Sequence, residues 1–116
     1  MQYLLLIFED PTERDGLDAA ERAEIYPGYR AFTTAIQQSG QFLNGDPLEP
    51  PATATTLRLR GGRRLITDGP FAEAKEQLVG YYAVEASDLD EALGLAARIP
   101  SVRFGAVEVR PILKLG

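Results

Sequence analysis

Six consecutive apolar residues near the start of the chain, Tyr3–Phe8, constrain the fold more than any other feature of the sequence. Successive side chains of a β-strand point to opposite faces of its sheet, so this strand is apolar on both faces. Strands of that kind are covered on both sides. A second run, Leu78–Glu85, is rich in aromatic and β-branched residues and has nearly the same character. We therefore expect a sheet with two buried faces.

The longest predicted helix runs from Asp18 to Ser39. Its start resembles a capping box, because Asp18 can accept a backbone hydrogen bond and Glu21 follows three residues later. Gly40 suits the position just after a helix end. Pro27-Gly28 interrupts the apolar pattern, so we expect either a kink there or a short helix followed by a second one.

A second helix is expected to begin within Ser87–Glu91 and to end at Pro100. The apolar stripe predicted for it consists of Leu89, Ala92, Leu93, Ala96 and Ile99. Three more strands are predicted, two of them joined by a Gly61-Gly62 turn: Thr55–Arg60, Arg63–Thr67 and Gly105–Val109. We expect loops at Glu9–Leu17 and Gln41–Thr55, and a polar turn at Phe71–Gln77.

The predicted order is β-α-β-β-β-α-β, one strand more than the ferredoxin-like βαββαβ plan. We therefore expect the α+β, ferredoxin-like fold with an added β-hairpin. At 116 residues, one domain covering 1–116 is expected. Two helices cover only one face of such a sheet. Since the other face is also apolar, we expect it to be buried between two sheets in a symmetric homodimer.

Composition excludes several kinds of site. The chain has no His and no Cys, so no His-based triad, thiolate metal site or disulfide can form within it, and we predict no metal and no cofactor. The formal net charge is −5, although residues 51–72 hold four Arg and one Asp. We favour a solvated hairpin face over a nucleic-acid patch for those arginines. No signal peptide or membrane span is predicted, which favours a cytoplasmic protein.

Several polar residues are candidates for a site. Asp68 is a candidate acid at a strand end, although we favour an Asx-turn with Gly69 as its main role, and the two roles are compatible. Lys75 is one of two lysines in the chain and could bind an anion or act as a base. Glu108 and Arg110 alternate along one strand and share a face. The remaining candidates are Asp46 in the long loop and the adjacent Tyr81 and Tyr82, which point to opposite faces.

The segment TDGPFAEAKEQL at 67–78 resembles the DGPF group of the YCII-related family. The likeness extends to MQYLLLIFED at 1–10, LEPPATATT at 48–56, SDLDEA at 87–92 and EVRPI at 108–112. It implies a dimeric α/β barrel built on the ferredoxin-like fold. It also implies a functional link to an extracytoplasmic-function sigma factor, which family members often accompany.

The better-known YCII branch carries a His on its first helix, suspected of catalysis together with an Asp. Counting back from Gly40, the matching position here is Tyr29, so that His is absent. Any acid or base must therefore be a carboxylate or a lysine. Haem or quinone chemistry would rest on fold analogy alone.

These patterns lead to two alternative functions. The first is a homodimeric small-molecule-binding protein with a weak enzymatic role, whose pocket is lined by Tyr29, Asp68, Lys75 and Arg110. Whether it catalyses a reaction is left open. The second is a non-catalytic interaction protein that acts in regulation with a sigma factor. An exposed apolar or Arg-rich patch outside the dimer interface would favour the second.

Overall fold

The computed structural model describes residues 1–115. The strands are β1 (Gln2–Glu9), β2 (Phe42–Pro47), β3 (Thr55–Arg60), β4 (Arg63–Asp68), β5 (Gln77–Glu85) and β6 (Gly105–Pro111). The helices are α1 (Pro11–Asp15), α2 (Ala19–Gln38) and α3 (Leu89–Ala96), with short 3₁₀ turns η1 (Pro51–Thr53) and η2 (Pro100–Arg103).

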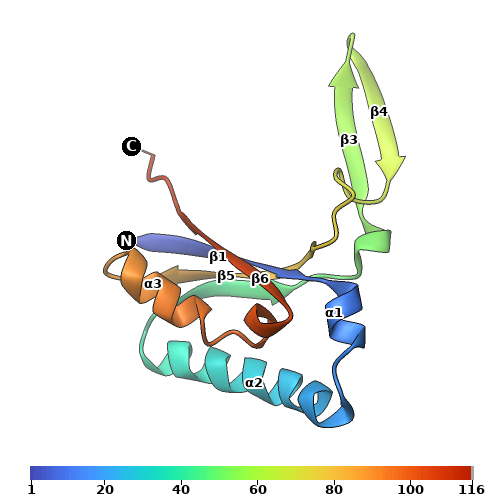
Figure 1. Cartoon of the computed structure of the whole chain (residues 1–116). Helices are drawn as coiled ribbons and strands as arrows, with labels where there is room; N and C mark the ends of the chain where they lie inside the picture. Colours follow the sequence, from blue (N-terminus) through green and yellow to red (C-terminus); the bar gives the residue numbers. More distant parts are fainter. Residues whose placement is uncertain (116) are drawn as a thin grey trace.

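The main sheet is antiparallel, with strand order β2-β5-β1-β6. This is the ferredoxin-like order, and β3 and β4 are the added hairpin, so the predicted α+β fold is confirmed. Helices α2 and α3 lie on one side of the sheet (Figure 1). Tyr3, Leu5 and Ile7 of β1 point to that side and are buried, whereas the alternate side chains of β1 face the other side and are partly exposed.

Strand β2 occupies part of the segment that we expected to be a loop. The prediction was wrong because Leu-Asn-Gly-Asp-Pro is a poor strand sequence, and this edge strand depends on pairing with β5. Gly45 is required at its place in β2. A Cβ atom there would lie 2.7 Å from the Tyr82 ring, so only glycine lets the backbone pass so close.

Helix α2 has the predicted capping box, because Asp18 and Glu21 each accept a backbone hydrogen bond from the other. Of the two expected alternatives, the division into two helices is wrong, since α2 continues through Pro27. The kink at Pro27 stays a prediction. Pro27 and Ala23, four residues before it, are both exposed, so water can satisfy the Ala23 carbonyl that proline leaves without a donor. Gly28 faces the body of the protein, where an added Cβ would lie 2.8 Å from Cγ of Pro100.

The two remaining helices also correct the predictions. The expected loop after β1 contains α1, whose N-cap is Asp10. In α3 the buried residues are Ala92, Leu95 and Ala96, while Leu89 and Leu93 are about half exposed. The predicted apolar stripe was therefore partly wrong, because it included Leu89 and Leu93 and omitted Leu95. The 3₁₀ turn η2 follows α3 as a further element.

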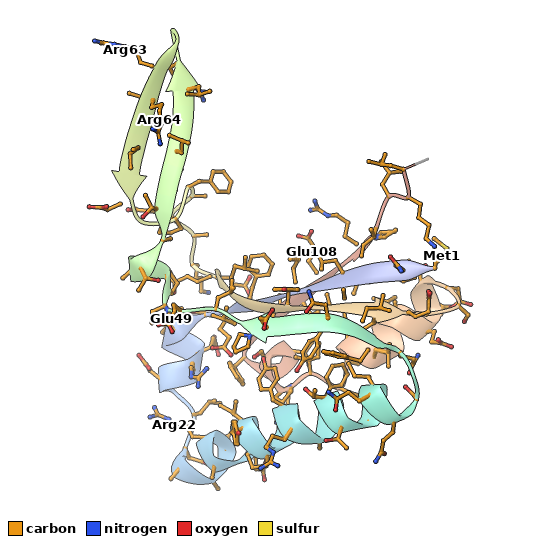
Figure 2. All side chains as sticks on the ribbon, turned by 180° about the vertical axis from the view of Figure 1, so that it is seen from behind. Met1, Arg22, Glu49, Arg63, Arg64 and Glu108 are labelled. Carbon is orange, nitrogen blue, oxygen red and sulfur yellow. The ribbon has the colours of Figure 1, made fainter. Side chains whose placement is uncertain are left out.

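Strands β3 and β4 pair with each other in a separate two-stranded sheet, the arm (residues 55–68). It extends away from α2 and α3, on the other side of the main sheet (Figures 1 and 2). The radius of gyration is 16.2 Å, against about 13 Å for a compact domain of this length. The strands and turn were predicted correctly, but half-burial was not, because Leu57 and Leu59 are 53% and 63% exposed.

Candidate functional site

Two buried acidic residues stand together where β1 ends. Glu9 is 7% exposed and Asp10 is 3% exposed. Glu9 continues the alternation of β1 and points to the same side as the core residue Ile7. Asp10 follows at the junction with α1. Buried carboxylates are uncommon and need partners that compensate for the lost hydration.

Glu9 is held by a chain of hydrogen bonds across four elements. Its Oε2 accepts a 2.6 Å hydrogen bond from the hydroxyl of Ser101, which is fully buried in η2. Ser101 is also hydrogen-bonded to the phenol of Tyr29 on α2. The other oxygen, Oε1, pairs with Arg14 of α1. This network joins β1, α1, α2 and η2, and fixes the charge of Glu9 beneath the protein surface.

Burial raises the pKa of the Tyr29 phenol from 10.0 to about 12, and the negative charge of Glu9 adds to this effect. The folded protein therefore holds this proton more tightly than the unfolded chain does. The resulting stabilisation is fully present below pH 10 and is lost as the pH rises from 10 to 12. It amounts to about 2 kcal/mol once partial solvent exposure of the phenol is allowed for.

Replacing Tyr29 by Phe should remove this dependence. We expect the difference in unfolding free energy between wild type and Tyr29→Phe, measured by urea denaturation, to shrink by about 2 kcal/mol between pH 9 and pH 12. Both proteins contain the same other tyrosines, lysines and arginines, so the contribution of their titration cancels in this difference. Parallel pH profiles for the two proteins would contradict the buried-phenol explanation.

Asp10 lies beside Glu9, and its buried carboxylate has two separate partners. Its Oδ1 accepts a hydrogen bond of 2.9 Å from the backbone N–H of Thr12, which caps α1. Its Oδ2 lies 3.4 Å from Nζ of Lys75, a largely exposed side chain in the segment between the arm and β5. A cavity of about 260 Å³ opens at this point, lined by Asp10, Glu13, Lys75, Glu76, Arg103, Phe104 and Gly105. We call Glu9, Asp10 and this lining the Glu9–Asp10 site.

Four of the predicted residues lie elsewhere, on the side of the sheet away from the helices. The register places Glu108, Leu6, Tyr81 and Asp46 in one row across the strands, with Arg110, Leu4, Ala83 and Asn44 in the next. We call this side of the sheet the open face. Figure 2 shows Glu108 on the side toward which the arm extends.

Polar contacts occur at both edges of the open face. Tyr81 donates a 2.8 Å hydrogen bond to Asp46 and accepts one from Asn44. Because its hydroxyl donates to a carboxylate, the pKa of Tyr81 is raised above its usual value. Glu108 and Arg110 form an ion pair at the opposite edge. Between these edges the side chains are apolar, so the centre of the open face carries no acid or base.

The predicted pocket of Tyr29, Asp68, Lys75 and Arg110 does not form as one site. Tyr29 is joined to Glu9, and Lys75 to Asp10, whereas Arg110 lies on the open face. Asp68 is exposed at the end of β4 and does not line the cavity beside Lys75. Gly69 has the positive φ expected of it, at 99°. The Gly69 N–H donates to the carbonyl of Ala54 at 2.7 Å and not to the Asp68 carboxylate.

Four residues in and beside the site were not predicted from the sequence: Glu9, Asp10, Arg14 and Ser101. The sequence does contain a signal for two of them, because the acidic residues Glu9 and Asp10 directly follow an apolar strand. Glu9 also falls in the alternating series of side chains that point to the core. Ser101 has no comparable signal. Its place depends on η2 packing against α2, where Gly28 allows the close approach of Pro100.

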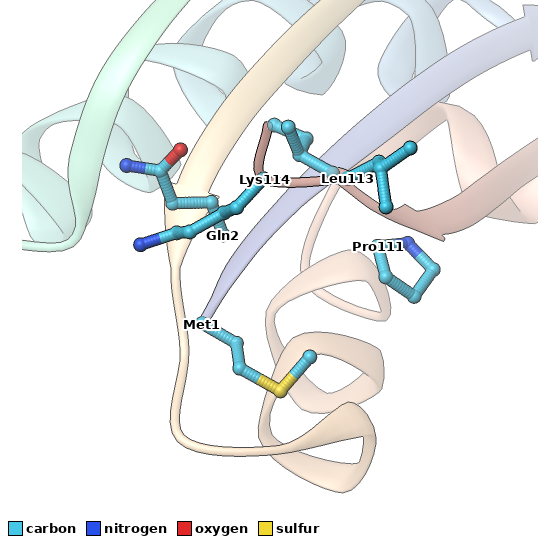
Figure 3. Close-up of a pocket in the computed structure, with 6 residues that line it drawn as sticks. Met1, Gln2, Pro111, Leu113 and Lys114 are labelled. Atoms are coloured by element: carbon cyan, nitrogen blue, oxygen red, sulfur yellow. The ribbon is translucent and has the colours of Figure 1, made fainter. Parts of the chain in front are cut away.

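A second cavity, of about 390 Å³, lies between the two ends of the chain. Its lining is Met1, Gln2, Pro111, Ile112, Leu113 and Lys114, and Figure 3 shows most of these side chains around it. The backbone N–H of Ile112 donates to the carbonyl of Gln2 at 2.9 Å. Within residues 1–115 no carboxylate side chain lines this cavity.

The fold and the Glu9–Asp10 site describe a ferredoxin-like α+β protein with a polar cavity at the end of its first strand. The YCII-related domain matches residues 1–115, so the chain belongs to the YCII-related family. An uncharacterised protein of Rhizobium meliloti strain 1021 is 32% identical over 114 residues, covering 97% of this chain and 92% of that protein. Among residues 1–115, no helix has the length and apolar character needed to cross a membrane.

A solved structure with the same fold is 5-chloro-2-hydroxyhydroquinone dehydrochlorinase from Burkholderia phenoliruptrix AC1100, in complex with 2,5-dihydroxybenzoquinone. The TM-score is 0.55 and the sequence identity 18%, and the match covers 100% of this chain and 96% of the dehydrochlorinase. At this identity the likeness establishes the fold.

Proposed function

We propose that this protein binds a small, oxygen-rich molecule at the Glu9–Asp10 site and works as a homodimer. The observation that carries the binding proposal is Asp10, which is 3% exposed yet has one oxygen aimed at a cavity and at Lys75. A buried carboxylate beside a cation at the edge of a polar cavity is typical of binding and catalytic sites.

The cavity lining indicates the chemistry of the ligand. Three acids, Asp10, Glu13 and Glu76, can accept hydrogen bonds from hydroxyl groups. Lys75 and Arg103 can donate to carbonyl oxygens or oxyanions. A molecule that carries both kinds of group fits this mixture best. The structural neighbour in complex with 2,5-dihydroxybenzoquinone supports the proposal by analogy, since that compound has both.

Asp10 is the group in this cavity best suited to move a proton. Its Oδ1 is held by the backbone of Thr12, while Oδ2 is turned toward Lys75 and the cavity. Glu9 is fully engaged with Ser101 and Arg14, so it supplies fixed charge behind the site. In the weak enzymatic role we propose, Asp10 exchanges a proton with a bound hydroxyl group, and Lys75 stabilises the resulting oxyanion.

The open face supports the homodimer. Its centre consists of Leu4, Leu6, Phe8 and Ala83, and within residues 1–115 no helix covers it. Soluble monomers rarely leave a continuous apolar patch of this kind exposed. Two such sheets packed face to face around a twofold axis would bury both patches and leave the polar edges at the rim.

Lys75→Met tests the binding site, with 2,5-dihydroxybenzoquinone as the probe in a calorimetric titration. Losing one charged hydrogen bond should weaken binding by about tenfold or more. Because Lys75 is largely exposed and Asp10 keeps its hydrogen bond from Thr12, the variant should stay folded, with a melting temperature lowered by about 4 °C at most. The matched control is Lys114→Met, which removes the other lysine and should bind as wild type does. An unchanged affinity in Lys75→Met, an equal loss in both variants, or no binding by wild type would contradict the proposal.

The alternative function is regulation through a protein partner, such as an extracytoplasmic-function sigma factor. The observation that favours it is the arm, which is exposed and rich in arginine. Size-exclusion chromatography of an equimolar mixture with the sigma factor tests this alternative. A stable complex that is lost when the arm arginines are replaced by glutamine would favour regulation, and separate elution would exclude a direct contact.

A further inference from the structure

Within residues 1–115 the two strands of the arm pair only with each other. A single two-stranded hairpin is at best marginally stable in water. Leu57 and Ile66 are directly opposite each other, and Leu59 lies on the same face two residues along. All three are more than half exposed, Leu59 at 63% and Ile66 at 61%. A face of this kind needs a partner surface to remain ordered and to avoid aggregation.

The contacts that tie the arm to the body lie at its base or just beyond it. Gly69 N–H donates to the carbonyl of Ala54 at 2.7 Å, and Thr56 donates to the carbonyl of Gly69 at 2.8 Å. Arg58 donates to the carbonyl of Phe71 at 3.3 Å. These bonds anchor the arm without covering its apolar face. The covering surface must therefore come from another molecule.

Charge indicates which molecule this is. The arm contains four arginines and Asp68, which gives it a charge of +3, whereas the rest of the chain carries −8. A second copy of this chain thus presents an acidic body to a basic arm. A nucleic acid would complement the arginines but would leave Leu57, Leu59 and Ile66 exposed to water.

The direction of the arm agrees with this partner. The arm extends from the side of the main sheet that α2 and α3 leave open, and Arg63 and Arg64 lie in its outer part (Figures 1 and 2). A copy docked on the open face would therefore lie beside the arm. We propose that the arm packs its Leu57–Leu59–Ile66 face against the second copy, so that each protomer of the dimer is held by the arm of the other. This inference rests on the dimer proposed above.

Photo-cross-linking tests whether the arm contacts a second copy. Because the chain has no native cysteine, a thiol-reactive label attaches at the cysteine that is introduced. Leu59→Cys is labelled with benzophenone maleimide and illuminated at a concentration where wild type sediments as a dimer. We expect a covalent dimer on a denaturing gel. The control is Thr34→Cys, which places the same label on the exposed surface of α2 and should yield monomers.

A second variant removes the arm. The paired ends Thr55 and Asp68 can be joined by two glycines in place of residues 56–67, and no residue of the hydrophobic core lies in that segment. We expect a folded protein whose dimer dissociation constant rises at least tenfold in sedimentation equilibrium.

The outcomes distinguish the proposed role of the arm from the existence of the dimer. A dimeric wild type whose Leu59 label forms no covalent dimer, or whose arm-free variant dimerises equally well, would overturn the role of the arm and leave the dimer standing. A monomeric wild type would overturn both. Ligand binding at Lys75 is measured independently of either result.

Discussion

Gly105→Ala should destabilise the protein by about 3 kcal/mol or more. Gly105 is the first residue of β6 and pairs with Glu9 of β1. A Cβ atom at position 105 would overlap the carbonyl oxygen of Phe8 and lie 2.9 Å from Cα of Glu9. Both obstacles are backbone atoms of a central strand, so no side-chain rotation can relieve the clash, and the two strands would have to separate.

Gly94→Ala is the matched control. An added Cβ at Gly94 meets no atom within 4 Å, and the residue lies inside α3. Because alanine favours helices over glycine, this variant should be unchanged or more stable by up to about 1 kcal/mol. Urea denaturation followed by circular dichroism measures both variants. A Gly105→Ala protein as stable as wild type would show that β6 does not approach β1 this closely.

The consequence of Gly105→Ala extends to the proposed site. Gly105 lines the cavity, and the backbone N–H of Asp10 donates to the carbonyl of the neighbouring Phe104 at 3.4 Å. Moving β6 would therefore move Asp10 relative to Lys75. We expect any folded fraction of this variant to bind the quinone probe more weakly than wild type does, whereas Gly94→Ala should bind normally.

The elements that the sequence predicted correctly are those with strong local patterns. The apolar run of β1, the Asp18 capping box and the Gly61-Gly62 turn each depend on neighbouring residues. Strand β2 does not, because it exists through its pairing with β5 and the close approach at Gly45. The arm was predicted as a hairpin, but its separation from the main sheet is a long-range property that residue alternation cannot reveal.

The candidate site was predicted residue by residue, and most of the residues lie on two separate surfaces. Asp68 is exposed at the end of β4, and Tyr82 is buried in the core. Lys75 was identified because lysine is rare in this chain, yet its partner Asp10 was overlooked within an assumed loop. Tyr29 was selected through the family resemblance, and the structure links it to Glu9 through Ser101. These links join residues up to 92 positions apart, so only the folded chain could bring them together.

Leu6→Glu should convert the proposed dimer to a monomer. Leu6 lies at the centre of the open face, between Glu108 on β6 and Tyr81 on β5. In a monomer the new carboxylate stays partly exposed to water, so the fold and its melting temperature should change little. In a face-to-face dimer it would be buried near Glu108 and near its own symmetry mate. Burying an unpaired charge costs several kcal/mol, which corresponds to at least about a hundredfold weaker association.

Leu93→Glu is the control for this experiment, since Leu93 is a half-exposed leucine on α3, on the helix side of the sheet. Sedimentation equilibrium at micromolar concentration should show dimers for wild type and Leu93→Glu, and monomers for Leu6→Glu. Circular dichroism should show the same folded structure in all three, because the substitution acts on the association and leaves the core of each protomer intact. A Leu6→Glu protein that remains fully dimeric would place the interface elsewhere, and the apolar centre of the open face would then need another partner to cover it.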